Sequence, residues 1–299
     1  MLDYNIPGGK NERGLLFLRS YMALNSRSNN ILPDKVFRLG WAHEMFQAYF
    51  LVADDIMDGG KLRRGKPCWF RQPSIGLGAV NDVFLLERLI SMNIRCDWPT
   101  NQAEQLVQAF DNINRDTACG QLLDVDETKP DDFTLDLYST VVRLKTSMYT
   151  FVLPVESALI LTDRFDLLHS CRQLGCELGY YFQAQDDYLD CFGDRANVGK
   201  DSQDIQNGKC SWLAVMAAQH LSNDEHLWRE FVENYGQSAP ASVAKIRHMY
   251  TETLKLPQVY ADFERCQIET ISENIALLRE PKLETVYSEL LDTLCSRQK

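Results

Sequence analysis

The sequence has no long hydrophobic run, no C-x-x-C pair and no surplus of positive charge. Because a membrane span needs about 18 uncharged apolar residues in a row, we expect no transmembrane helix. Residues 1–7 also contain no apolar run of the kind that forms a secretory signal peptide. These absences predict a soluble protein.

Basic residues are outnumbered, since 31 Lys+Arg stand against 42 Asp+Glu and the formal net charge is −11. Binding to nucleic acid needs a basic face that displaces counterions from phosphates, so we expect no nucleic-acid partner. A small anionic ligand remains compatible with this charge. A local cluster of cations or a bound metal can reverse the field inside one cleft.

The nine cysteines are odd in number and scattered, which argues against a disulfide scaffold or a zinc site. They predict a reduced, cytoplasmic protein that uses cysteine as a small core residue. The five histidines share no spacing typical of metal ligands, and neither H-E-x-x-H nor a calcium loop occurs. We therefore interpret each histidine as ordinary structure.

Strand-like alternation is nearly absent, whereas long segments repeat apolar residues with the period of a helix. The pattern predicts helices over 34–58, 81–96, 100–124, 134–162, 164–192, 209–222, 224–235, 240–255, 257–278 and 282–296. Gly59 and Gly60 should end the first, and Pro154 should kink the fourth without ending it. No linker or shift in composition divides the chain. We expect one all-α domain over residues 1–299, although this length would allow roughly two domains.

A D-D-x-x-D motif occurs at Asp54–Asp58 and again at Asp186–Asp190. The first and last aspartates of each motif lie on one face of a helix and form a carboxylate patch. Such neighbours raise one another's pKa unless a cation neutralises them. Mg²⁺ prefers oxygen ligands and often completes its octahedron with water and phosphate oxygens. A single motif would be read as a solvated helix end, but two, each following apolar residues, predict a magnesium and diphosphate site.

Cations lie near both motifs, in the segments 61–67, 8–14 and 199–209. Arginine suits bidentate recognition of phosphate, and glycine lets the backbone approach a ligand closely. The segment 8–14 is not a Walker A loop, because its first glycine and its Ser/Thr are missing. Lys145 lies in the middle of a predicted helix, where a lysine usually extends to solvent.

These residues resemble the farnesyl diphosphate synthase family, which are short-chain trans-prenyltransferases of the isoprenoid synthase class. The matches follow the family order over nearly the whole chain: G-G-K-x-x-R-G at 8–14, Q-A-Y-F-L-V-A-D-D-I-M-D at 47–58, R-R-G-K-P-C-W at 63–69, K-T at 145–146, F-Q-A-Q-D-D-Y-L-D-C-F-G-D at 182–194 and D-I-Q-x-x-K-C-S-W at 204–212. The resemblance implies a bundle of about ten helices around a central cavity, usually in a homodimer. It implies a head-to-tail condensation of dimethylallyl or geranyl diphosphate with isopentenyl diphosphate.

The resemblance also implies roles, motif by motif. The metal ligands for three Mg²⁺ would be Asp54, Asp58 and Asp186, with Asp55 and Asp190 completing the motifs. The allylic diphosphate would be held by Arg63, Lys145, Lys200 and Lys209, and isopentenyl diphosphate by Lys10, Arg13, Gln47 and Arg64. The groups near the reacting carbons would be Lys145, Thr146 and Gln183. Tyr49 and Phe50, about one 5.4 Å turn deeper than Asp54, would either form a floor that limits chain length or be ordinary core aromatics.

The chain departs from the family pattern in several places. The usual N-terminal helical segment is absent, Tyr180 stands where many relatives have Glu, and 201–203 read D-S-Q instead of I-G-T. One alternative is a terpene synthase or irregular prenyl-coupling enzyme built on the same scaffold, and another is a non-enzymatic regulatory relative. The intact isopentenyl-binding set favours farnesyl or geranyl diphosphate synthesis over the first alternative. The two intact motifs argue against the second.

Overall fold

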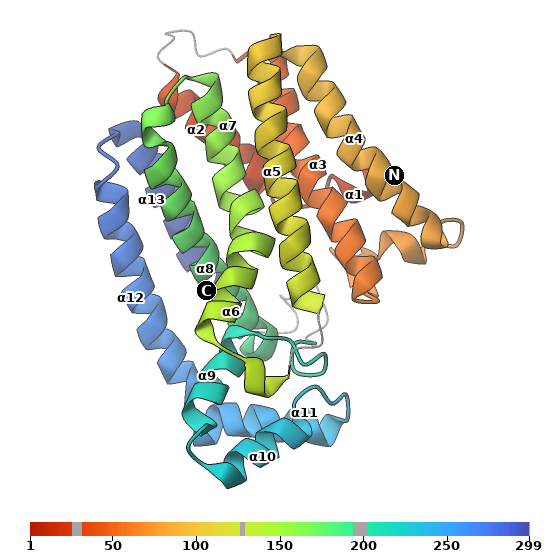
Figure 1. Ribbon diagram of the computed structural model, residues 1–299, viewed down its shortest axis with the longest axis vertical. Helices are drawn as coiled ribbons and strands as arrows, with labels where there is room; N and C mark the ends of the chain where they lie inside the picture. The colour runs from red at the N-terminus through yellow and green to blue at the C-terminus, as the bar shows by residue number, and fades with distance from the viewer. Residues whose placement is uncertain (26–31, 126–128, 194–202, 299) are drawn as a thin grey trace.

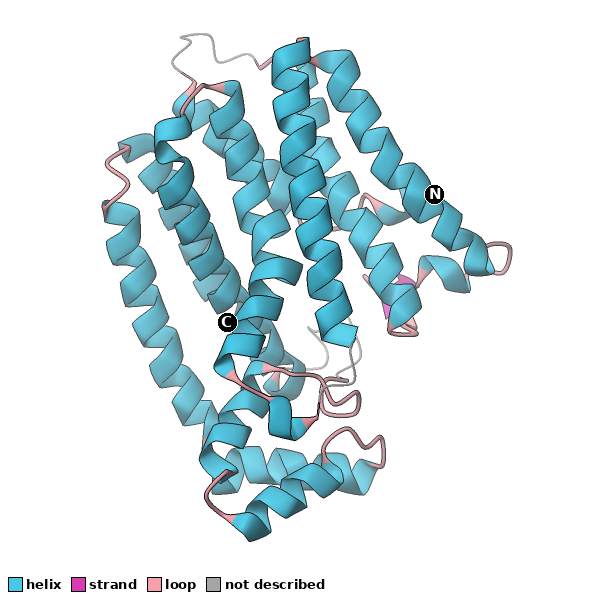
Figure 2. Cartoon of the chain, viewed as in Figure 1, coloured by secondary structure: helices cyan, strands magenta, loops and turns pink. Residues whose placement is uncertain are grey.

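The computed structural model describes residues 1–25, 32–125, 129–193 and 203–298, and these are almost entirely helical (Figure 1, Figure 2). The α-helices are α1 (Leu2–Asn5), α2 (Glu12–Leu24), α3 (Asp34–Met57), α4 (Ala79–Asp97), α5 (Thr100–Val125), α6 (Leu135–Val142), α7 (Leu153–Leu161), α8 (Leu168–Phe192), α9 (Trp212–Leu221), α10 (Glu225–Asn234), α11 (Pro240–His248), α12 (Leu256–Ala276) and α13 (Pro281–Cys295). Two short strands, β1 (Leu62–Arg63) and β2 (Lys66–Pro67), form an antiparallel hairpin. The predicted all-α class is confirmed.

Every predicted helix is present, with ends that shift by a few residues, but the predicted helix 240–255 is α-helical only to His248 and continues as a short π-helix, η6 (Met249–Thr253). Gly59 does end α3, since its φ of 63° lies in the left-handed region that glycine adopts without strain. Two further predictions need correction. The helix α2 was not predicted, because the glycines and charges of 8–14 mask its start. The predicted helix 134–162 is not uniform: α6 and α7 flank a π-helix, η4 (Arg143–Val152), whose wider turns a helical apolar period does not reveal.

Two glycines let the neighbouring helices approach η4 directly. A Cβ atom added to Gly120 of α5 would overlap the backbone of Lys145, and one added to Gly179 of α8 would overlap the side chain of Ser147. Both helices therefore pack backbone against η4. This contact fixes the position of Lys145 and Thr146, which lie at the start of η4.

The helices α3, α5 and α8 run in the same direction, so their C-terminal ends lie toward one end of the bundle (Figure 1). The stretch from α6 through η4 to α7 runs back against α5 and α8 (Figure 1). The shorter helices α9, α10 and α11 lie beyond the C-terminal ends of α3, α5 and α8 (Figure 1). Acidic residues at three helix ends are thereby brought into one region.

Apolar side chains form a main core along the long helices and a second core around α9–α12. His43 of α3 is buried in the main core, where its ring centroid lies 5.2 Å from that of Phe17 and 5.0 Å from that of Phe110. Neither ring nitrogen of His43 has a hydrogen-bond partner in the described part of the chain. Among the described helices, none is both long and apolar enough to cross a membrane.

Candidate functional site

An acidic cavity lies where the C-terminal parts of α3, α5 and α8 meet η4. Its polar lining is Asp54, Asp58, Asp124, Lys145, Thr146, Gln183, Asp186, Asp187, Asp204 and Lys209. The fold thus brings together the two aspartate motifs, which are more than a hundred residues apart in the chain, and two of the four predicted allylic-diphosphate ligands, Lys145 and Lys209.

Asp124 of α5 joins the two lysines of this cavity. Its Oδ2 accepts hydrogen bonds from Lys145 Nζ at 2.6 Å and Lys209 Nζ at 2.7 Å. Burial raises the pKa of Asp124, but the two ammonium groups outweigh burial and hold the pKa below its usual value. Burial likewise lowers the pKa of Lys145, whereas Asp124 and Asp54 raise it further, so the net shift is upward. All three groups are therefore charged at neutral pH.

Arg63 neutralises the first motif from its other side. It donates to Asp55 Oδ1 from Nη2 at 2.6 Å and from Nε at 3.0 Å, and Nη2 also lies 3.1 Å from Asp54 Oδ2. Because consecutive helical residues point about 100° apart, Asp55 faces Arg63 instead of lining the cavity with Asp54. Burial raises the pKa of Asp54, but Lys145 and Arg63 outweigh it and the pKa is lowered.

The pKa of Asp58 is raised, whereas that of Asp54 is lowered. Burial and the neighbouring charge of Asp54 raise its pKa, and Lys209 Nζ, 3.4 Å from Asp58 Oδ1, does not fully offset them. An additional cation beside Asp58 would offset this rise in pKa.

The three aspartates of the second motif have different hydrogen-bond partners. The carboxylate of Asp187 accepts from Tyr138 Oη, from the backbone N–H of Trp212 and from Gln183 Nε2, each at 2.8 Å. Burial raises the pKa of Asp187 to about 6. Gln183 Oε1 in turn accepts from Thr146 Oγ1 at 2.8 Å. Asp187 therefore fixes the pair Thr146–Gln183.

The other two aspartates of this motif have different neighbours. Asp190 is buried and accepts from the backbone N–H of Asp204 at 3.3 Å. Asp186 lines the cavity, and its Oδ1 lies 3.3 Å from Arg297 Nη2. Asp186 and Asp187 both line the cavity with Asp54 and Asp58, and the carboxylate of Asp187 is held by its three hydrogen-bond donors.

A second pocket adjoins the acidic cavity and is cationic. Its lining includes all four residues predicted to bind isopentenyl diphosphate, Lys10, Arg13, Gln47 and Arg64, together with Thr150, Phe182 and Arg297. Arg13 Nη2 donates to Thr150 Oγ1 at 2.8 Å, and the guanidinium of Arg297 stacks 4.4 Å from the Phe182 ring centroid.

The two pockets share their walls. On α8, Phe182 lines the cationic pocket and the next residue, Gln183, lines the acidic cavity. On η4, Thr150 lines the cationic pocket, and Thr146, four residues earlier, lines the acidic cavity. Two ligands, one in each pocket, would therefore meet between the same two segments.

The donor set of the acidic cavity fits a hard divalent cation, because Asp54, Asp58 and Asp186 offer only carboxylate oxygens. Among the described residues, no three Cys, His, Asp or Glu side chains converge on one point. The first-motif carboxylates are instead turned toward Arg63 and Lys145.

Some predicted residues lie elsewhere. Tyr49 and Phe50 pack on each other with ring centroids 4.4 Å apart, and neither lines either pocket. Their role as a floor stays a prediction. Lys200 lies outside the described residues.

Several residues of the site were not predicted from the sequence, including Asp204, which lines the acidic cavity. Gln121 donates to Asp54 Oδ1 at 3.0 Å, Asp124 joins the two lysines, and Arg297 lies between the two pockets. Gln121 and Asp124, three residues apart at the end of the predicted helix 100–124, do carry a signal, since they form a polar pair on one helix face. Arg297 is a single cation near the end of the chain, and no pattern marks it.

Known proteins resemble this chain over its whole length. A farnesyl pyrophosphate synthase of Panax ginseng is 40% identical over 310 residues, which cover 100% of this chain and 89% of the relative. Farnesyl pyrophosphate synthase 1, mitochondrial, of Arabidopsis thaliana is 38% identical over 312 residues, covering 100% and 79%. Among solved structures, a T. brucei farnesyl diphosphate synthase complexed with risedronate superposes with a TM-score of 0.89 at 32% identity, covering 100% of this chain and 89% of that one.

The family profile named polyprenyl synthetase matches residues 1–253. Sequence, fold and the paired pockets agree, and we conclude that the chain belongs to the polyprenyl synthetase family and is a prenyltransferase.

Proposed function

We propose that the protein condenses an allylic diphosphate, dimethylallyl or geranyl, with isopentenyl diphosphate, head to tail, to give farnesyl or geranyl diphosphate. The observation that carries this proposal is the pair of adjoining pockets, one acidic and one cationic, which share α8 and η4 as walls. Two diphosphates bound in them would have their hydrocarbon parts side by side. The reaction ionises the allylic C–O bond, the isopentenyl double bond attacks the allylic cation, and a proton is lost.

The acidic cavity is proposed to hold the allylic diphosphate. Proteins of this family act with a divalent metal, and we propose three Mg²⁺, held by Asp54, Asp58 and Asp186, with Asp55 and Asp190 supporting the motifs. Bound magnesium supplies positive charge at the departing diphosphate. The cations proposed to contact that diphosphate are Arg63, Lys145, Lys200 and Lys209.

The carboxylates and cations of the cavity neutralise one another in the ligand-free arrangement. Arg63 and Lys145 bind Asp54, and Lys209 binds Asp58 and Asp124. Metal cations bound to these carboxylates would replace Arg63, Lys145 and Lys209 as their partners. The three basic side chains would then be free to donate hydrogen bonds to phosphate oxygens.

The cationic pocket is proposed to bind isopentenyl diphosphate through Lys10, Arg13, Gln47 and Arg64, and Arg297 joins this set because it lines the same pocket. Thr146 and Gln183 line the acidic cavity on the two segments that also carry Thr150 and Phe182 of the cationic pocket, and they are ordered by their mutual hydrogen bond. They place uncharged polar oxygens near the reacting carbons. The released diphosphate is the proposed proton acceptor, and the closed cavity keeps water from the cation.

A product assay tests the proposal. Purified protein with Mg²⁺ and both substrates is expected to release geranyl or farnesyl diphosphate, identified by mass spectrometry after phosphatase treatment. Hydrocarbon formed from geranyl or farnesyl diphosphate alone would instead indicate a terpene synthase. An irregular product would indicate a coupling enzyme, and no turnover with any substrate would indicate a regulatory relative. The Asp54→Asn variant is the matched inactive control.

We also propose that the protein is a homodimer. Exposed apolar side chains recur along α4, where Val80, Phe84, Leu85 and Met92 are 42%, 67%, 49% and 55% exposed. Exposed apolar side chains that recur along one helix are typical of a protein contact, and a second copy of the chain can cover them symmetrically. Light scattering coupled to size exclusion would give twice the chain mass, and the variant Phe84→Glu would give the single mass.

Residues 1–299 are proposed to form a single trans-prenyltransferase domain, supported by relatives that align over the whole chain. We propose the cytoplasm as its location, since all nine cysteines are unpaired, as in a reducing compartment. Fluorescence microscopy of a tagged chain tests this location. A mitochondrial signal, in line with the name of the Arabidopsis relative, would contradict it.

A further inference from the structure

Arg63 and Arg64 are adjacent in the β1–β2 hairpin, but their side chains contact different parts of the site. Arg64 and Gly65 form its turn with φ values of 52° and 73°, the pair of positive φ values that a two-residue type I′ turn requires. Arg63 comes before the turn and binds Asp54 and Asp55, whereas Arg64, in the turn, lines the cationic pocket. A left-handed conformation is uncommon for arginine and needs support from its surroundings.

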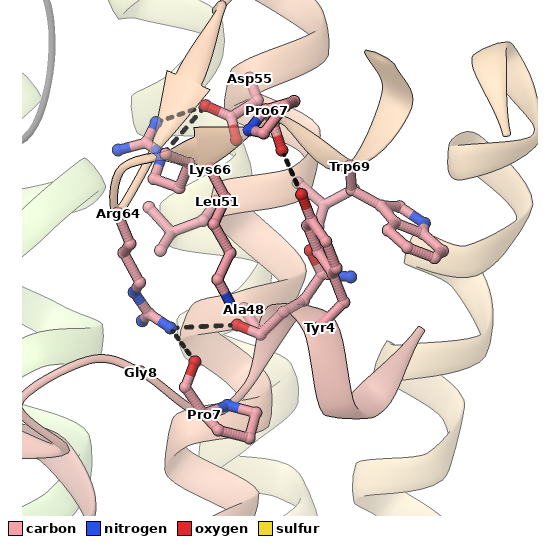
Figure 3. A pocket seen from close by; sticks show the side chains of 13 residues that line it. Tyr4, Pro7, Gly8, Ala48, Leu51, Asp55, Arg64, Lys66, Pro67 and Trp69 are labelled. Carbon is pink, nitrogen blue, oxygen red and sulfur yellow. Dashed lines mark hydrogen bonds and ion pairs between the residues drawn. The ribbon is translucent and has the colours of Figure 1, made fainter. Parts of the chain in front are cut away.

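The end of α1 supplies that support. Nη1 of Arg64 donates to the carbonyl oxygens of Asn5 at 3.2 Å and Pro7 at 3.1 Å (Figure 3). It also donates to the carbonyl oxygen of Ile6 at 3.1 Å. On its other side, the guanidinium lies so close to Gly9 that a Cβ atom there would sit 2.7 Å from Nη2. The side chain is thus held between α1 and the glycine-rich segment that follows it.

A helix of four residues is not stable alone, and Tyr4 ties α1 to the hairpin. The Tyr4 hydroxyl donates to the Pro67 carbonyl oxygen at 2.7 Å (Figure 3). It accepts from Gln72 Nε2 at 2.7 Å. The Tyr4 ring lies 5.1 Å from the ring of Trp69, whose Nε1 donates to Asp82 at the start of α4 at 2.7 Å. Tyr4 therefore connects α1, β2 and α4.

We infer that Tyr4 is a positioning residue that sets the affinity for isopentenyl diphosphate by holding the α1 carbonyls against Arg64. This inference rests on the proposed role of Arg64. Tyr4 lines the small pocket of Figure 3 and not the cationic one, so it acts without touching the substrate. Arg63 lies on the same hairpin, but its guanidinium is held by Asp54 and Asp55, so we expect the loss of the Tyr4 hydroxyl to affect Arg64 more than Arg63.

The variant Tyr4→Phe tests the inference, because it removes the hydroxyl and keeps the ring on Trp69. The loss of one hydrogen bond that orders Arg64 should raise the KM for isopentenyl diphosphate about three- to tenfold. The KM for the allylic substrate, kcat and the melting temperature should stay near the wild-type values. The same exchange in α2, Tyr21→Phe, is the control and should change none of these quantities. A purely structural role would lower the melting temperature and affect both substrates equally.

A double-mutant cycle separates this inference from the proposed function. If Tyr4 acts through Arg64, Tyr4→Phe has no further effect on the KM for isopentenyl diphosphate in an Arg64→Gln background. An equal effect in both backgrounds, or no effect of Tyr4→Phe in the wild type, would overturn the inference. If Arg64→Gln itself leaves that KM unchanged, the proposed isopentenyl site is wrong. The independent variant Gln72→Leu should raise the same KM, and an unchanged value would also count against Tyr4.

Discussion

Acid should destabilise this fold through His43, the unpartnered ring between Phe17 and Phe110. Burial lowers its pKa to about 3, from an ordinary value of 6.5. Between these two pH values the unfolded chain binds a proton that the folded chain does not bind. The free energy of unfolding therefore falls as the pH drops below 6.5 and stops falling near pH 3, where the folded state also takes up the proton.

The size of the effect follows from the two pKa values. At pH 5 the unfolded histidine is protonated in a ratio of about 30 to 1, which corresponds to about 2 kcal/mol of lost stability relative to pH 7.5. His43→Leu replaces the ring by an apolar side chain of similar size, so it should remove this loss. The free energy of unfolding of the variant should vary with pH by about 2 kcal/mol less than that of the wild type over this interval.

Urea unfolding followed by circular dichroism, at fixed protein concentration and at several pH values, measures the difference. The same exchange at the exposed His169 of α8 is the control, and its pH profile should run parallel to that of the wild type. If the His43→Leu profile also runs parallel to the wild type, the buried neutral histidine does not explain the acid sensitivity and the reasoning fails.

Three further predictions concern the site. Tyr49→Ala with Phe50→Ala should lengthen the product, as seen by chromatography; products of unchanged length would show that these rings are not the floor. Asp124→Asn leaves two buried ammonium groups without their shared carboxylate, so kcat/KM for the allylic substrate should fall by about tenfold or more, and unaltered kinetics would contradict its role. Gly120→Ala inserts a methyl group against the backbone of η4 and should cost about 1–3 kcal/mol of stability; an unchanged urea midpoint would disprove that contact.

Much of the fold could be predicted because the residues that determine each helix lie within that helix or directly beside it. Apolar periods located the long helices, and Gly59 marked the end of α3. The π-helix η4 could not be predicted, because its position depends on how closely α5 and α8 approach at Gly120 and Gly179. Nothing in the sequence around Gly120 or Gly179 indicates that both glycines face η4.

The same difference between local and long-range information applies to the residues of the site. The aspartate motifs were visible because each repeats a carboxylate at helical spacing within one segment. Asp124 and Arg297 bind partners more than twenty residues away in the chain. The polar pair Gln121 and Asp124 marks a helix face in the sequence, but only the folded structure reveals the partners of Asp124 and the place of Arg297. The different directions of Arg63 and Arg64 likewise depend on a turn geometry that their adjacency in the sequence does not express.

The common direction of α3, α5 and α8 has an electrostatic consequence. The unpaired carbonyls at the C-terminal end of a helix carry about half a negative charge, so three such ends add a negative potential of backbone origin to the aspartates. Replacing the aspartates by asparagines would therefore remove only part of the negative potential, and the helix ends would still oppose Lys145 and Lys209 in the same cavity. The electrostatics of the cavity thus depend on the path of the main chain as well as on the side chains.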